Sequence, residues 1–84
     1  MNVSFTPTAL EDFRRWIRHE RKIADRILAL LEEVKRTPFE GTGKPEPLKF
    51  NLAGCWSRRI NLEHRLVYMV KAGEIVVIAC RYHY

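Results

Sequence analysis

Cysteine is scarce in this chain, and the spacing of its two cysteines matches no metal-binding pattern. Cys55 and Cys80 each lie within an apolar, strand-like segment, so we expect two buried free thiols. The sequence also lacks an opening signal segment, a membrane-spanning apolar run, an internal repeat and a low-complexity stretch. These absences argue against secreted, membrane-spanning and repeat proteins, and they predict a cytoplasmic protein that needs no metal or cofactor.

Glycine and proline are also few, with four of each, and half of them fall between Phe39 and Leu48. Within that stretch, Pro45 and Pro47 flank Glu46. Proline fixes its own backbone and restricts the residue before it, which holds such a segment extended. The pattern therefore predicts either a carboxylate presented from a stiff segment or an ordinary surface glutamate in a loop.

Acidic residues are outnumbered, which gives the 84-residue chain a net charge of +5. Residues 1–40 nearly balance, with eight Lys and Arg against seven Asp and Glu, whereas residues 41–84 carry seven against three. A chain of this length forms one domain, residues 1–84, with a thin core. The positive charge of the second half predicts an acidic partner, which is either a nucleic acid or an acidic protein.

Apolar residues recur at helical spacing in the first half of the chain. A short strand over Val3 to Phe5 precedes Thr6-Pro7-Thr8, which is typical of a helix start. Two helices are predicted, one ending at a break near His19, on a solvated face, and one from about Glu20 to Lys35. Their buried faces are predicted to consist of Ala9, Leu10, Phe13, Trp16 and Ile17 on the first helix and Ile23, Ile27, Leu30, Leu31 and Val34 on the second.

Three segments rich in β-branched and aromatic residues follow, at Cys55 to Ile60, Arg65 to Val70 and Ile75 to Tyr82. The links between them are short, which predicts antiparallel hairpins. The element order β-α-α-β-β-β places the chain in the α+β class. We expect a small antiparallel sheet with the helix pair packed on one face.

The link between the last two strands decides which side chains share a face of the sheet, because neighbours along a strand alternate between faces. A three-residue link over Lys71-Ala72-Gly73 would set Arg65 opposite Ala79. Arg81 and His83 would then lie on the same face as Arg65.

The earlier link, around Asn61-Leu62-Glu63, has no glycine, and its length is ambiguous from the sequence. A three-residue version would place Arg59 directly opposite Arg65. Like charges in that position repel each other, and an anion between them would relieve the repulsion.

The chain ends in Arg81-Tyr82-His83-Tyr84, which combines a cation, an imidazole and two phenols. Such groups can pair with a phosphate, transfer a proton near neutral pH and stack on a base. The alternative is that the tyrosines cover the edge of the core and His83 is incidental. We expect Tyr82 to pack, while Arg81 is open between a phosphate contact and a structural pairing.

Cleavage of RNA without a metal requires a base for the ribose 2′-OH, an acid for the leaving 5′-oxygen and cations for the charge that builds at phosphorus. Glu46 is a candidate base and His83 a candidate acid, and the reverse assignment stays open. Arg59 and Arg65 are candidates to clamp the phosphate. Because DNA has no 2′-OH, this chemistry predicts RNA as the substrate.

Four motifs cover the second half of the chain almost continuously. They are TPFEGTGKPEPLK at Thr37 to Lys49, NLAGCWSRRI at Asn51 to Ile60, EHRLVY at Glu63 to Tyr68 and ACRYHY at Ala79 to Tyr84. Together they resemble the YoeB-type (Txe) toxins of bacterial type II toxin–antitoxin modules, in the RelE/ParE superfamily. The first half of the chain agrees with this family more in pattern than in identity.

The resemblance implies a RelE-like fold and an endoribonuclease that cuts mRNA in the ribosomal A site and so inhibits translation. By matching positions, the resemblance implies Glu46 as the general base and His83 as the general acid. It also implies that Arg65 stabilises the phosphorane and that Tyr84 lies beside the scissile nucleotide. Phosphate contacts fall to Lys49 and Arg59, with Arg81 as a third candidate. Glu63 is expected to hold the side chain of Arg59 or Arg65 in place without contacting the phosphate itself.

The partners that the resemblance implies are a cognate antitoxin of the YefM or Phd type, the ribosome with its mRNA, and a second copy of the chain. Operator DNA would be bound only through the antitoxin complex, and no membrane is involved. The alternative function is a non-catalytic poison such as the ParE-like inhibitors of gyrase. A binder of that kind would need neither Glu46 nor His83 as a proton-transfer group.

Overall fold

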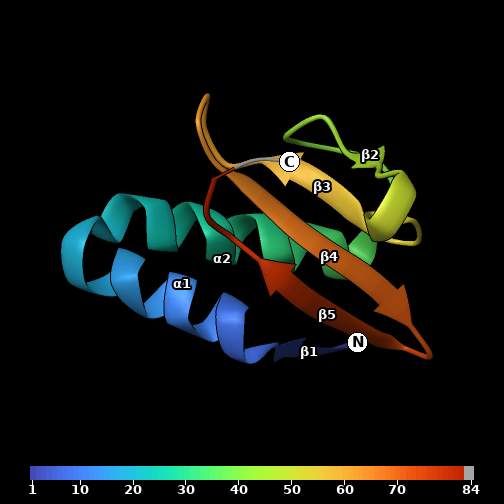
Figure 1. Ribbon diagram of the computed structural model, residues 1–84, viewed down its shortest axis with the longest axis horizontal. Helices are drawn as coiled ribbons and strands as arrows, with labels where there is room; N and C mark the ends of the chain where they lie inside the picture. The colour runs from blue at the N-terminus through green and yellow to red at the C-terminus, as the bar shows by residue number, and fades with distance from the viewer. Residues whose placement is uncertain (83–84) are drawn as a thin grey trace.

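The structure is a computed structural model that describes residues 1–82, so the predicted site residues His83 and Tyr84 lie outside the described residues. The elements in chain order are β1 (Asn2–Phe5), α1 (Pro7–His19), α2 (Arg21–Arg36), β2 (Glu46–Pro47), the 3₁₀ turn η1 (Phe50–Leu52), β3 (Trp56–Arg59), β4 (Arg65–Lys71) and β5 (Glu74–Ala79). The strands form one sheet in the order β1-β5-β4-β3-β2, with the two helices packed on one face (Figure 1). The predicted α+β class is confirmed.

The sheet is mixed, whereas the sequence predicted a wholly antiparallel sheet. Strands β2 to β5 pair in antiparallel fashion, but β1 runs parallel to β5, with Val3 beside Ile75. The helix pair, and not a hairpin, follows β1 in the chain, so no tight turn forces this strand to run antiparallel to its neighbour. A further difference is β2, a short strand inside the segment predicted as a loop.

Both helices form where the apolar spacing predicts them. Thr6 caps α1, since its Oγ1 accepts a hydrogen bond from Ala9 N at 3.1 Å, and Pro7 occupies the first helical position. The predicted break is confirmed, because α1 ends at His19 and α2 begins at Arg21. Within residues 1–82, neither helix has the length and apolar character that a membrane crossing requires.

The predicted buried face of α2 is confirmed, but that of α1 is partly wrong. Leu10 and Ile17 are 50% and 42% exposed, because α1 buries only the narrow stripe of Ala9, Phe13 and Trp16 against its neighbours. The core on the helical side of the sheet also includes Ile27, Leu30, Leu31, Val34, Ile60, Leu66, Tyr68, Ile75, Val77 and Cys80.

A second, smaller apolar cluster lies on the opposite face of the sheet, which we call the open face. It contains Cys55, Val67 and Ala79, with Leu48, Met69 and Ile78 packed against them. Both cysteines are free and buried, as predicted. Burial raises the pKa of the Cys80 thiol to about 12, helped by the nearby Asp12 carboxylate, so this thiol stays protonated at neutral pH.

The link between β3 and β4 has three residues, which is one of the lengths that the sequence allowed. Ile60 N donates to His64 O at 2.9 Å, and Arg59 lies opposite Arg65. The sequence left this length undecided. The observed register brings two guanidinium side chains to adjacent positions on neighbouring strands.

The hairpin between β4 and β5 differs from the prediction. Its link has two residues, Ala72 and Gly73, whose φ angles of 46° and 78° are those that a tight hairpin turn favours. An irregularity in the pairing next to Val67 then sets Val67, and not Arg65, opposite Ala79. Ala79 nevertheless stays on the face of Arg65, because Val67 and Arg65 are two positions apart on β4.

Candidate functional site

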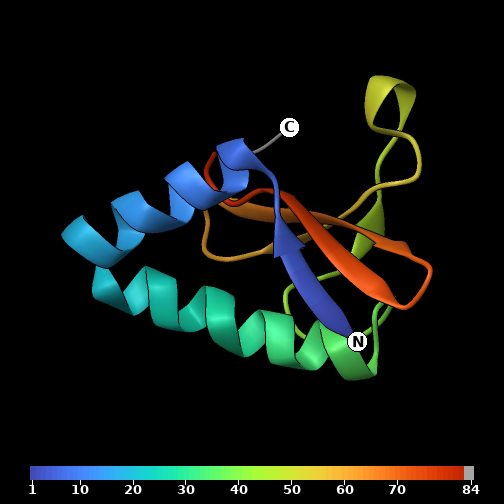
Figure 2. The ribbon, with the colours of Figure 1, turned by 90° about the horizontal axis from the view of Figure 1, so that it is seen from below.

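Strand alternation places three of the predicted site residues on the open face. Glu46 pairs with Ser57 on β3, Ser57 lies two positions before Arg59, and Arg59 pairs with Arg65. Figure 2 shows α2 crossing on one side of the sheet while the turn that contains η1 rises from the other side. The candidate base and the two candidate phosphate ligands therefore share a face that α2 does not cover.

The two arginines form an electropositive pair on this face, at the ends of β3 and β4 next to their link. Residues directly opposite on antiparallel strands have Cβ atoms about 5 Å apart, so the charges of Arg59 and Arg65 repel each other. Nη1 of Arg65 is buried and has no hydrogen-bond partner among the described residues. A buried donor without an acceptor costs free energy, and a bound anion would supply both the acceptor and the opposite charge.

Glu46 occupies the short strand β2 beside this pair. Its neighbour Pro47 lies opposite Trp56, and Leu48 N donates to Cys55 O at 2.9 Å, which continues the pairing beyond the strand. The structure thus shows the stiff-segment alternative, with an exposed Glu46 side chain. Lys49 follows as an exposed residue at the start of η1.

A buried arginine that the sequence analysis did not single out supports the segment before Glu46. Arg58 is completely buried on the helical side of the sheet. It makes an ion pair of 2.6 Å with Glu33 of α2 and a hydrogen bond of 3.2 Å with the Tyr68 hydroxyl. Its guanidinium also donates to the backbone carbonyls of Thr37, Glu40 and Thr42. One side chain thereby joins α2, the sheet and the segment 37–42.

Two glycines allow this segment to lie close to Glu33 and β3. A Cβ atom on Gly41 would stand 2.1 Å from Glu33 Oε1, and one on Gly43 would stand 2.9 Å from the backbone oxygen of Arg59. Their φ angles of 124° and 87° also favour glycine. Hydrogen bonds from Thr42 N and Oγ1, followed by the charge of Arg58, hold the pKa of Glu33 below its usual value, so Glu33 is ionised at neutral pH.

A sequence signal for Arg58 exists in the alternation of β3. Trp56 and Ile60 both face the helices, and Arg58 stands between them at the same parity. A charged residue in an apolar row is rare unless it is paired. Its partner Glu33 is 25 positions away in the chain, and nothing in the sequence identifies it.

In the described part of the C-terminal tail, the Arg81 side chain is paired with its neighbour Tyr82, as the structural alternative expects, and the phosphate contact stays a prediction. Arg81 Nη2 donates to the Tyr82 hydroxyl at 2.6 Å, and the guanidinium carbon lies 4.4 Å from the centre of that ring. Tyr82 packs against the ring of His64 at 5.6 Å. Glu63 Oε1 lies 3.7 Å from Nε2 of His64. The expected role of Glu63 toward Arg59 or Arg65 stays a prediction.

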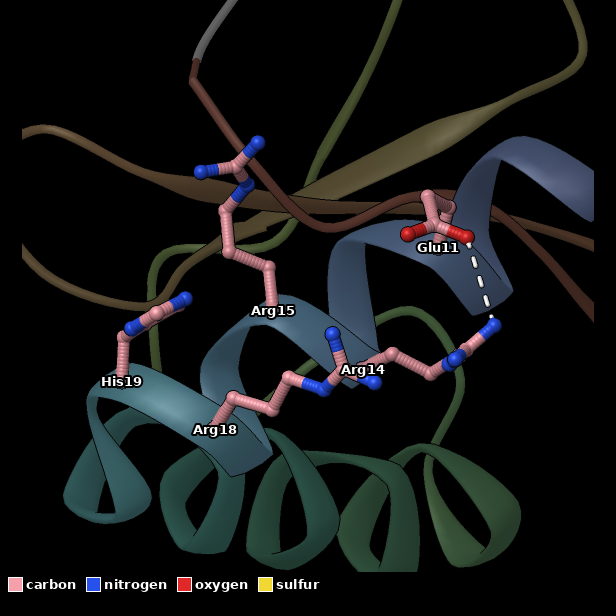
Figure 3. A pocket seen from close by; sticks show the side chains of 5 residues that line it. All are labelled: Glu11, Arg14, Arg15, Arg18 and His19. Carbon is pink, nitrogen blue, oxygen red and sulfur yellow. Dashed lines mark ion pairs between the residues drawn. The ribbon is translucent and has the colours of Figure 1, made fainter.

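A shallow hollow on the solvent side of α1 is separate from these residues. It has a volume of about 100 Å³ and is lined by Glu11, Arg14, Arg15, Arg18 and His19 (Figure 3). Arg14 and Glu11 form an exposed ion pair of 3.6 Å there. This agrees with the predicted solvated face. Across residues 1–82, His, Cys, Asp and Glu side chains form no group of three or more that could hold a metal ion.

Comparison with known proteins supports the family resemblance of the sequence motifs and extends it to both halves of the chain. The family described as "YoeB-like toxin of bacterial type II toxin-antitoxin system" matches residues 5–84. Toxin YoeB of Escherichia coli (strain K12) is 48% identical over 84 residues, which is 100% of both chains.

Solved structures agree as well. The YoeB/ParE toxin from Agrobacterium tumefaciens superposes with a TM-score of 0.95 at 45% identity, with 100% of both chains covered. YoeB of Staphylococcus aureus is 46% identical over 100% of this chain and 98% of that chain. It superposes with a TM-score of 0.92 in a heterotetrameric YoeB-YefM complex and 0.94 in a dimer. The chain therefore belongs to the YoeB-like family of toxins from bacterial type II toxin–antitoxin systems.

Proposed function

We propose that this toxin is a ribosome-dependent endoribonuclease that cleaves mRNA in the A site and thereby stops translation. The observation that carries the proposal is the guanidinium pair on the open face, where Arg59 lies opposite Arg65 and Arg65 Nη1 is buried without a partner among residues 1–82. A phosphodiester is an anion that satisfies both groups. Glu46 stands on the same face, at the position that the family resemblance assigns to the general base.

The proposed reaction begins when Glu46 takes the proton from the ribose 2′-OH. The 2′-oxygen then forms a bond to phosphorus, and the charge on the non-bridging oxygens is stabilised by Arg65 and Arg59. The bond from phosphorus to the 5′-oxygen breaks, and His83 protonates that oxygen. The products are a 2′,3′-cyclic phosphate and a 5′-hydroxyl end. Lys49 is assigned to the phosphate backbone and Tyr84 to the nucleotide beside the cut.

We infer that the partner of this toxin is a YefM-like antitoxin and that the toxin pairs with a second copy of itself. The support is the full-length similarity to the Staphylococcus aureus protein, whose structures are a heterotetrameric YoeB-YefM complex and a YoeB dimer. A net charge of +5 also suits an acidic partner segment. Purification from the native operon should yield a stable complex with the neighbouring gene product, and recovery of the toxin alone would contradict the inference.

The experiment that tests the proposed activity is induction of the chain in growing cells, followed by mapping of the 5′ ends of mRNA. We expect new 5′-hydroxyl ends inside translated regions, in the reading frame of the ribosome, and no such ends when translation initiation of the same message is blocked. The gyrase-poison alternative predicts growth arrest with DNA breaks and without new mRNA ends. That result would overturn the proposal.

A further inference from the structure

His64 occupies a buried position at the end of the link between β3 and β4. It is only 7% exposed, and its ring packs edge-on against Trp16 of α1 at 4.7 Å. The backbone on this side of the link is also ordered, because Asn61 Oδ1 accepts hydrogen bonds from Glu63 N and His64 N. The imidazole is therefore held in one place by the helix and by its own turn.

The ring of His64 contacts the C-terminal tail directly. Its Nδ1 accepts a hydrogen bond from Tyr82 N at 2.7 Å, and Arg65 N donates to Tyr82 O at 2.8 Å. Both backbone groups of Tyr82 are thus satisfied by consecutive residues of the β3–β4 hairpin. Tyr82 has a φ of 61°, which is uncommon for an aromatic residue and persists where the surroundings impose it.

The residue two positions earlier is held from α1. Trp16 Nε1 donates to Cys80 O at 2.8 Å, and Asp12 Oδ2 accepts from Cys80 N at 3.1 Å. The tail is consequently fixed at Cys80 by the helix and at Tyr82 by the hairpin. Trp16 belongs to both anchors, since it bonds Cys80 and supports the ring of His64.

We propose that His64 is a positioning residue that fixes the backbone of Tyr82 and so sets the point from which His83 and Tyr84 extend. An Nδ1 that accepts a hydrogen bond carries no proton, so the neutral ring bears its proton on Nε2, the nitrogen that faces Glu63 Oε1. The consequence for catalysis rests on the proposed function. Reacting groups displaced by about 1 Å can lose about a hundredfold in rate, so an anchor one residue before His83 matters.

The test uses His64→Phe, which keeps a flat ring against Trp16 but removes the acceptor, and His64→Gln, whose amide oxygen can accept from Tyr82 N. Leu62→Ser is the matched control, because Leu62 lies in the same link and is 94% exposed. We expect the Tyr82 amide to exchange with solvent about fivefold faster or more in His64→Phe, as for a lost hydrogen bond. In the wild type, the ¹⁵N shift of His64 Nδ1 should be that of an unprotonated nitrogen.

Cleavage of ribosome-bound mRNA should follow the same order. His64→Phe is expected to lower kcat about 10- to 100-fold with little change in KM, whereas His64→Gln recovers most of the rate and Leu62→Ser matches the wild type. An unchanged Tyr82 exchange rate in His64→Phe, or wild-type kcat in that variant, would overturn the proposal. If no form of the protein cleaves mRNA, the proposed function fails, and the exchange and ¹⁵N measurements still decide on the anchor.

Discussion

Replacing Arg65 with methionine is expected to lower the rate of mRNA cleavage by about 10²- to 10³-fold and to leave the fold intact. The loss in rate follows from the position of Arg65 opposite Arg59, where its guanidinium can meet the charge that develops at phosphorus. The fold should persist because the Arg65 side chain has no hydrogen-bond partner among the described residues at Nη1. Methionine retains most of the apolar stem of arginine, and the substitution leaves no hydrogen-bond acceptor among the described residues without its donor.

Lys71→Met is the matched control for this measurement. Lys71 is an exposed residue on the same strand, carries the same charge and lies about 20 Å from Arg65 along β4. Single-turnover cleavage and thermal unfolding should be measured for both variants. An equal loss of rate in Lys71→Met would mean that only net charge matters, and a wild-type rate in Arg65→Met would remove Arg65 from the site.

Replacing Arg58 with methionine is expected to lower the free energy of unfolding by about 3 kcal/mol. The variant leaves the Glu33 carboxylate without its charged partner and leaves the carbonyls of Thr37, Glu40 and Thr42 without their donor. Because the segment 37–42 leads into β2, the variant should also cleave mRNA more slowly. Urea unfolding monitored by tryptophan fluorescence measures the change in stability.

Arg59→Met separates stability from activity, since Arg59 is the next residue on β3 but has an exposed side chain. It should lose cleavage activity and change the free energy of unfolding by less than about 0.5 kcal/mol. Equal destabilisation by the two variants would contradict the role given to Arg58.

Acid dependence supplies a second readout for the Arg58 anchor. The pKa of Glu33 is held below its usual value, chiefly by the hydrogen bonds from Thr42, so its contribution to stability is present above the ordinary carboxyl pKa and is lost as the pH falls through the lowered pKa. The wild type should therefore lose more stability than Arg58→Met over that acid range. Parallel losses in the two proteins would show that the pair does not contribute.

Local patterns in the sequence were sufficient for the helices and for one face of the sheet. Alternation along a strand depends only on neighbouring residues, so Arg59 and Arg65 could be assigned to one face once the first hairpin had a three-residue link. The place of Glu46 on that face follows from the pairing of β2 with β3, which the sequence did not predict. The register of the second hairpin was not predicted, because it departs from the expected pairing twice. A two-residue turn shifts the register by one position, and the irregularity beside Val67 shifts it by one more, so that Ala79 again lies on the predicted face.

The two anchors of the site could not be predicted because their partners are distant in the chain. Arg58 meets Glu33 from 25 positions away, and His64 meets Tyr82 from 18 positions away. Leu10 and Ile17 were assigned to the core because the apolar face of α1 is wider in sequence than the stripe that its neighbours cover. Tertiary packing decides such contacts, and the periodicity of the sequence carries no information about that packing.

In the proposed reaction, the 2′-OH of the RNA itself attacks phosphorus, with Glu46 as the base. The most direct measurement is cleavage of a ribosome-bound mRNA that carries one 2′-deoxynucleotide on the 5′ side of the cut, compared with the all-ribose message. We expect efficient cleavage of the all-ribose message to a cyclic phosphate and a 5′-hydroxyl, a rate at least about 10²-fold lower with Glu46→Gln, and no cut at the deoxy position. Cleavage of the deoxy message at the normal rate would contradict it.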